Sequence, residues 1–236
     1  MLSPELAALT VTAASLGFFH TLLGPDHYLP FVVMARARRW SQARTAWITL
    51  FCGLGHIGSS VVLGLAGITL GMAVTSLEGI EALRGDLAAW ALIACGLVYF
   101  AWGLKKAYRY RPHEHSHFHE NGTAHTHRHI HGTDHAHVHG DNSRITPWVL
   151  FIIFVLGPCE PLLPVLMYPA AKESLAGMLW VTGVFGTVTI LTMMGIVLFS
   201  LRGISLIPLK GIERYTHALA GGTICLCGIA IQYLGV

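Results

Sequence analysis

Long apolar stretches with very few charges between them dominate this sequence. Only 11% of the 236 residues are Asp, Glu, Lys or Arg, against about 25% in a soluble domain. A further 53% of the residues are hydrophobic. A soluble protein needs a charged exterior, and this chain has too few charged residues to build one. The net charge of +3 is also too small and too scattered to favour nucleic-acid binding, so the sequence predicts an integral membrane protein.

Six of the apolar stretches are long enough to cross a bilayer, which takes about 20 residues. Two of them contain similar Gly-Pro sequences, GPDHYLP from Gly24 and GPCEPLLP from Gly157. Each of these opens a block of three spans, and an odd number of spans reverses the direction of the second block. We therefore expect an all-α integral membrane protein with six transmembrane helices in a 3+3 inverted repeat, with helices 1 and 4 broken at the Gly-Pro motifs. The alternative is that Gly-Pro only kinks two ordinary helices. The six stretches lie near residues 6–35, 45–74, 87–104, 146–171, 175–201 and 217–234.

The predicted repeat divides the chain into three parts: a first three-helix repeat at 1–104, a His-rich loop at 105–145 and a second three-helix repeat at 146–236. Thirteen of the 15 Lys and Arg residues follow the first, third and fifth spans. Because Lys and Arg favour the cytoplasmic side of a membrane, we expect both termini outside and the His-rich loop in the cytoplasm. The expected location is the plasma (inner) membrane.

Side chains able to bind a metal gather at the two Gly-Pro sequences. An ionisable group inside a span is costly and tends to be functional, and imidazole with carboxylate suits borderline divalent cations such as nickel, cobalt or zinc. The alternatives are histidines that bond to neighbouring helices, a small cysteine packed at a kink, and a glutamate that caps freed backbone amides. The candidate metal ligands are His20, Asp26, His27, His56, Cys159 and Glu160.

The loop between the third and fourth spans alternates histidine with small or polar residues. It has no hydrophobic periodicity, so we expect it to be disordered. Near neutral pH most of its imidazoles are uncharged and able to bind metal, which predicts a low-affinity auxiliary metal-binding loop. Its histidines are His113, His115, His117, His119, His125, His127, His129, His131, His135, His137 and His139.

These motifs resemble those of the nickel/cobalt transporter superfamily, in particular its NicO-type efflux branch. The segment from His20 to His27 resembles the H-x4-D-H signature, with one extra residue in the spacing. LGHIGSSVV around His56 is similar to the S-H-[ST] element, and GPCEP around Cys159 resembles G-x-x-P-C-P. The resemblance implies a membrane transporter for Ni2+ or Co2+, with Zn2+ as a further candidate, that works by alternating access and exports the ion.

On that hypothesis the partners are the transported metal ion and the lipid bilayer, with no nucleic acid, no prosthetic group and no catalytic residues, and the protein is not an enzyme. The chain also resembles CcdA/DsbD-type thiol-disulfide electron carriers, which have 3+3 spans and a Pro- and Cys-containing break in each half. That chemistry needs two cysteines able to meet, and Asp26 stands where the second break has Cys159. Unless Cys52 or Cys95 serves, the redox partner is missing. A third hypothesis is an accessory or sensor protein that binds metal without moving it.

Overall fold

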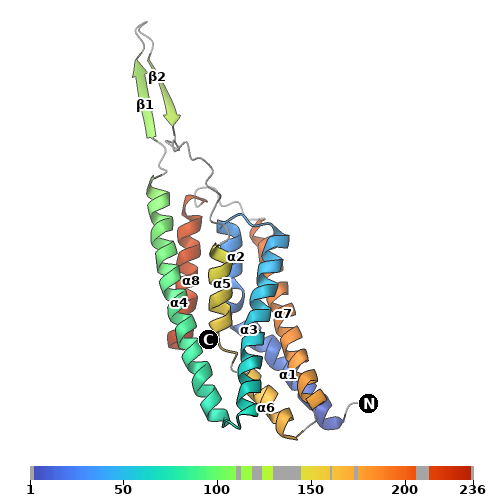
Figure 1. The fold of residues 1–236 in the computed structure, drawn as a ribbon. Helices are drawn as coiled ribbons and strands as arrows, with labels where there is room; N and C mark the ends of the chain where they lie inside the picture. Colours follow the sequence, from blue (N-terminus) through green and yellow to red (C-terminus); the bar gives the residue numbers. More distant parts are fainter. Residues whose placement is uncertain are drawn as a thin grey trace.

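The computed structural model describes residues 3–109, 113–118, 124–129, 145–159, 161–172, 175–205 and 213–234. Within these ranges the chain forms a bundle of α-helices from which a two-stranded hairpin extends at one end (Figure 1). The helices are α1 Pro4–Leu23, α2 Leu29–Ala37, α3 Gln42–Thr69, α4 Val74–Arg109, α5 Ile145–Leu156, α6 Leu162–Lys172, α7 Leu175–Ser205 and α8 Thr216–Leu234, with 3-10 turns η1 Pro25–His27 and η2 Glu213–Tyr215.

Five helices in the described ranges are long and apolar enough to cross a membrane. Large apolar side chains cover the outside of the bundle. Val62 is 67% exposed, Val98 71% and Phe199 79%, an arrangement that a soluble monomer rarely shows over so much surface. The chain is a multi-pass membrane protein. The predicted count of six differs because the fourth stretch forms two short helices, α5 and α6, neither of which spans by itself. The five ranges are Pro4–Leu23, Gln42–Thr69, Val74–Arg109, Leu175–Ile204 and Glu213–Leu234.

Helix α1 ends one residue before Gly24, and α2 begins only at Leu29. The N–H of Gly24 donates to the carbonyl of His20 at 3.0 Å, which closes the last turn of α1. Pro25 follows, has no N–H to continue the helical ladder, and starts the short turn η1. In the second half α5 ends at Leu156, and Gly157, Pro158 and Cys159 precede α6. Both chain segments leave regular helix where the sequence reads Gly-Pro.

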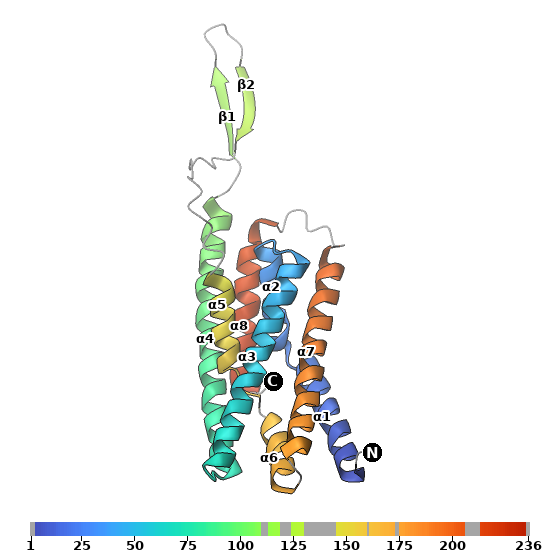
Figure 2. The same ribbon diagram turned by 45° about the vertical axis from the view of Figure 1, so that its right-hand side comes forward.

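The pair α4 and α8 packs closely because glycines face each other across it (Figure 2). A Cβ added at Gly96 of α4 would overlap the backbone of Cys225, and one at Gly221 of α8 would overlap the backbone of Phe100. Small residues of this kind let membrane helices approach until their backbones touch. One apolar core in the interior includes Phe31, Leu92, Phe154, Met193 and Ile224, and a second includes Ala13, Leu162 and Phe185.

Parts of the predicted His-rich loop have regular structure in the described ranges, while disorder of the loop as a whole stays a prediction. Helix α4 continues to Arg109, and the strands β1 His113–Phe118 and β2 Ala124–His129 pair in antiparallel fashion. His113 lies opposite His129, and His117 lies opposite His125. The sequence alternates with a period of two, which is the period of a β-strand. Histidine alternates here with mostly polar residues, so no apolar pattern marks these strands in the sequence.

Candidate functional site

Three of the predicted histidines lie together inside the bundle. His20 comes from the last turn of α1, His27 from η1 and His56 from α3. The ring centroids are 4.6 Å apart between His20 and His27, and 5.1 Å apart between His27 and His56. One ring nitrogen from each residue lies within 4.8 Å of the others. The sequence therefore placed these three residues in one cluster correctly; metal binding by them stays a prediction.

Backbone carbonyls orient two of these rings. The Nδ1 of His27 lies 3.2 Å from the carbonyl oxygen of Gly24 and 3.2 Å from the Oδ1 of Asp26, and the Nδ1 of His56 lies 3.3 Å from the carbonyl oxygen of Phe154 on α5. A carbonyl oxygen only accepts, so each Nδ1 carries the donated proton. In the neutral ring the Nε2 then presents a lone pair. The Nε2 atoms of His20, His27 and His56 are all buried without a hydrogen-bond partner.

Because Gly24 has no side chain, the side chains of His27 and Asp26 can pack closely against it at the first interruption. A Cβ at this position would lie 2.7 Å from the Nδ1 of His27 and 2.9 Å from the Oδ1 of Asp26. Both side chains fold back over the glycine, which leaves no room for a larger residue there. The sequence GPDH thus supplies the helix end, the turn and the hydrogen-bonded pair within four consecutive residues.

A cavity of about 550 Å³ lies beside the histidine cluster, and both interruptions contribute to its wall. The first half supplies the three histidines, and the second half supplies residues at the end of α5 and the start of the following segment. Asp86, an exposed residue of α4, lies at the same cavity. Its lining includes His20, Gly24, Asp26, His27, His56, Gly85, Asp86, Phe154, Gly157, Pro158 and Ile231.

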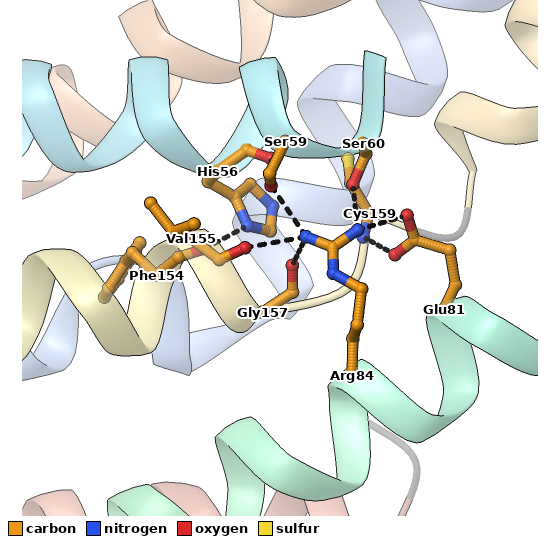
Figure 3. A network of polar contacts seen from close by, with 9 residues as sticks. All are labelled: His56, Ser59, Ser60, Glu81, Arg84, Phe154, Val155, Gly157 and Cys159. Carbon is orange, nitrogen blue, oxygen red and sulfur yellow. Dashed lines mark hydrogen bonds and ion pairs between the residues drawn. The ribbon is translucent and has the colours of Figure 1, made fainter. Parts of the chain in front are cut away.

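Cys159 is fully buried in the second interruption, where an ion pair from α4 holds the chain (Figure 3). The backbone N–H of Cys159 donates to a carboxylate oxygen of Glu81 at 3.2 Å. Glu81 is fully buried and pairs with Arg84. The Glu81–Arg84 pair therefore anchors the second interruption to α4, a membrane-spanning helix.

Arg84 also binds the backbone groups that the end of α5 leaves without helical partners. Its guanidinium donates to the carbonyls of Val155 at 2.7 Å and Gly157 at 3.4 Å. It also donates to the hydroxyls of Ser59 and Ser60 on α3, at 2.6 Å and 3.3 Å (Figure 3). The last carbonyls of any helix need such partners. The arginine therefore holds α3, α4 and α5 together at the second interruption.

Glu81 and Arg84 are not among the predicted site residues, because the predicted third span begins near residue 87. A hydropathy pattern starts a span after such charges, whereas α4 starts at Val74 and carries both residues inside it. The spacing of three residues, which places an acid and a base on one helix face, was the available clue.

The other predicted metal ligands are not part of the three-histidine cluster in the described residues. Asp26 contacts His27, and neither Asp26 nor Cys159 belongs to the group of close donor atoms found among the described residues. Glu160 lies outside the described residues. The structure describes the backbone of β1 and β2 but not their side chains, so the loop histidines stay untested as ligands. Five of these, His119, His131, His135, His137 and His139, lie wholly outside the described ranges.

Comparison with known protein families gives one match. Residues 29–230 match the family described as the cytochrome C biogenesis protein transmembrane region. The chain belongs to this family. The matched residues run from α2 into α8 and take in most of the bundle. No curated protein and no solved structure matches the chain.

Membership of the cytochrome c biogenesis family corrects the assignment to the nickel/cobalt transporter superfamily, which is wrong. The functional prediction that followed from it, a Ni2+, Co2+ or Zn2+ transporter, is overturned with it. The resemblance depended on short motifs that matched inexactly at His20–His27 and at Cys159. A proline-interrupted span with a nearby cysteine occurs in both kinds of protein, so these few residues did not separate them.

Proposed function

We propose that this protein carries electrons across the membrane by thiol-disulfide exchange, as CcdA/DsbD-type carriers do. The observation that carries the proposal is the family match over residues 29–230. The position of Cys159 supports it, since this cysteine directly follows Pro158, which lines the cavity. The hydrogen bond from its backbone to Glu81 fixes the segment that carries the sulfur.

Cys227 is the best candidate for the second sulfur. It is buried on α8 in the neighbourhood of Asp26 and Tyr28, at the first interruption. Ile231, one helical turn further along α8, lines the same cavity as Pro158. Cys159 and Cys227 thus lie at different interruptions, and each has a near neighbour in the chain, Pro158 or Ile231, that lines the cavity. All five cysteines are free thiols in the structure.

The exchange proceeds in two balanced steps. The thiolate of Cys159 attacks the disulfide of an oxidised partner, forming a mixed disulfide and releasing one partner thiol. The thiolate of Cys227 then attacks the sulfur of Cys159 and releases the second partner thiol. The partner has gained two electrons and two protons, and the carrier holds a Cys159–Cys227 disulfide. A dithiol on the other side of the membrane reverses both steps and becomes oxidised itself.

A 3+3 inverted repeat supports this cycle, because one half must move relative to the other to bring the cysteines together. The packing of the helices is consistent with the repeat. Helix α1 packs on α7 as α5 packs on α3, and α2 packs on α8 as α6 packs on α4. In this proposal residues 1–104 and 146–236 are the two repeats, helices 1 and 4 are broken at Gly24 and Gly157, and residues 105–145 connect the repeats.

We also propose that the protein lies in the plasma membrane with both termini outside and the connecting segment in the cytoplasm. The connection from α2 to α3, the C-terminal ends of α4 and α7, and the start of α8 all lie at the end of the bundle that carries the hairpin (Figure 1). Those segments contain most of the Lys and Arg residues, and such residues favour the cytoplasmic side.

Transport of electrons into sealed vesicles tests the proposal. The full chain is reconstituted into liposomes that enclose the disulfide DTNB, whose reduction releases a coloured thiolate, and the impermeant reductant TCEP is added outside. Wild type should colour the lumen well above empty liposomes. The variants C159S and C227S should fall to the empty-liposome rate, and C225S should keep the wild-type rate because Cys225 packs against Gly96 of α4 instead. Wild-type flux equal to that of empty liposomes, or unchanged flux in C159S, contradicts the proposal.

A further inference from the structure

The histidine cluster leaves three ring nitrogens together without a hydrogen-bond partner. The Nε2 atoms of His20, His27 and His56 are buried and unpaired, although a buried polar atom without a partner destabilises the fold. The cluster draws its members from α1, η1 and α3, and the Nδ1 of His56 is fixed by α5 of the second half. Because each unpaired atom is costly, chance does not explain why four elements bring three of them together in one cluster.

The hydrogen bonds on the opposite ring edges are those that metal-bound histidines make. A metal-ligating imidazole almost always donates its other N–H to a backbone carbonyl or a carboxylate. The Nδ1 of His27 donates to Gly24 and Asp26, and the Nδ1 of His56 donates to Phe154. These contacts hold the tautomer that leaves the Nε2 lone pair free for a Lewis acid.

We propose that His20, His27 and His56 bind one divalent first-row transition-metal ion through their Nε2 atoms, as a resident site within the membrane. Imidazole ligands suit Zn2+, Cu2+, Ni2+ and Co2+. Three histidines with one open position form a recognised arrangement for such ions, and the cavity beside the cluster supplies the open position. This goes beyond the proposed electron transfer, because no cysteine belongs to the set, and it involves no movement of the ion.

The distances allow the site to close with small side-chain rotations. Metal–nitrogen bonds of about 2.0–2.1 Å place two ligands of a tetrahedral ion roughly 3.4 Å apart, and the donor atoms here lie within 4.8 Å of one another. His20 is half-buried at the end of α1. It has more room to adjust than His27 and His56, which are fully enclosed. Asp26 acts as a positioning residue through His27.

Titration with Co2+ alone tests the site in the full chain. The eleven histidines of the connecting segment are first replaced by serine at full length, so that they contribute no binding. Intense visible d–d bands of tetrahedral Co2+ should then appear with a stoichiometry of one ion per chain. H56A and H20A should each lose these bands or weaken binding at least tenfold. H217A should match the parent, since His217 contacts Tyr99 and Lys106 at the start of α8.

The remaining variants separate this site from its alternatives. D26N should weaken Co2+ binding about 10- to 100-fold while keeping the tetrahedral bands at saturation, because the three ligands remain. C159S should bind Co2+ as the parent does, whatever its electron flux, which separates this proposal from the proposed function. If H56A does not fold by circular dichroism, the half-buried His20 decides the matter through H20A. Absence of the bands in the parent, or identical binding in H20A and H217A, overturns the proposal.

Discussion

Replacing Arg84 by methionine gives the sharpest test of how the second interruption is held. The substitution keeps most of the side-chain volume but removes the charge that pairs with Glu81. The buried carboxylate would then keep the hydrogen bond from the backbone N–H of Cys159 but lose its positive partner. Removing one partner of a buried ion pair costs about 3–5 kcal/mol, because the other charge is left uncompensated. We therefore expect a loss of about 4 kcal/mol, or roughly a thousandfold change in the unfolding equilibrium constant.

The assay is reversible unfolding of the full chain in mixed micelles with increasing SDS, followed by circular dichroism. R214M serves as the control, because Arg214 is exposed at the end of the bundle and a change there should stay within about 0.5 kcal/mol. The double variant E81Q/R84M should be more stable than R84M, because it removes the unpaired charge. A loss below about 1 kcal/mol in R84M, or strictly additive losses in the double variant, would refute this account of the ion pair.

Two further substitutions test close approaches in the structure. Replacing Gly96 by valine should destabilise the protein by about 1–3 kcal/mol or more, because the new Cβ would meet the backbone of Cys225. Gly79 on the same helix has open space around it, so its valine variant should unfold like wild type in the same SDS titration. Equal losses of stability at both positions would contradict the close packing of α4 and α8. Replacing Gly24 by alanine should displace the ring of His27 and weaken Co2+ binding by about tenfold or more in the visible titration, and unchanged affinity would show that the glycine does not set this geometry.

The proximity of the three histidines was predictable from the sequence, although the reason for pairing His20 with His27 was wrong. His20 and His27 were paired because seven residues make nearly two helical turns. In the structure α1 ends between them, and the turn of η1 brings His27 back over Gly24. His56 was expected to join them from the following span, between glycines that allow close approach, and it does. The proximity of these residues was predictable because Gly-Pro interrupts a helix and a histidine in an apolar stretch needs polar neighbours.

The features that were missed depend on contacts between distant segments. Arg84 donates to the carbonyls of Val155 and Gly157, which are more than 70 residues away in the sequence. No local sequence pattern predicts such a partner. The family was misassigned because Asp26 stands where a second break cysteine was expected, so the thiol-disulfide carrier lacked its redox partner, and the match over residues 29–230 overturns that argument. The paired strands arise from a polar alternation that lies outside any apolar core.

The state of the cysteine thiols tests electron carriage most directly. The full chain in membrane vesicles is poised with an oxidant or with a dithiol, alkylated, digested and analysed by mass spectrometry. Oxidation should yield a cross-linked peptide pair that contains Cys159 and Cys227, and the dithiol should return both to free thiols, while Cys95, on the outer face of α4, stays out of the cross-link. If Cys159 and Cys227 stay separately alkylated under oxidising conditions that convert a soluble dithiol fully to its disulfide, they are not the redox pair of this carrier.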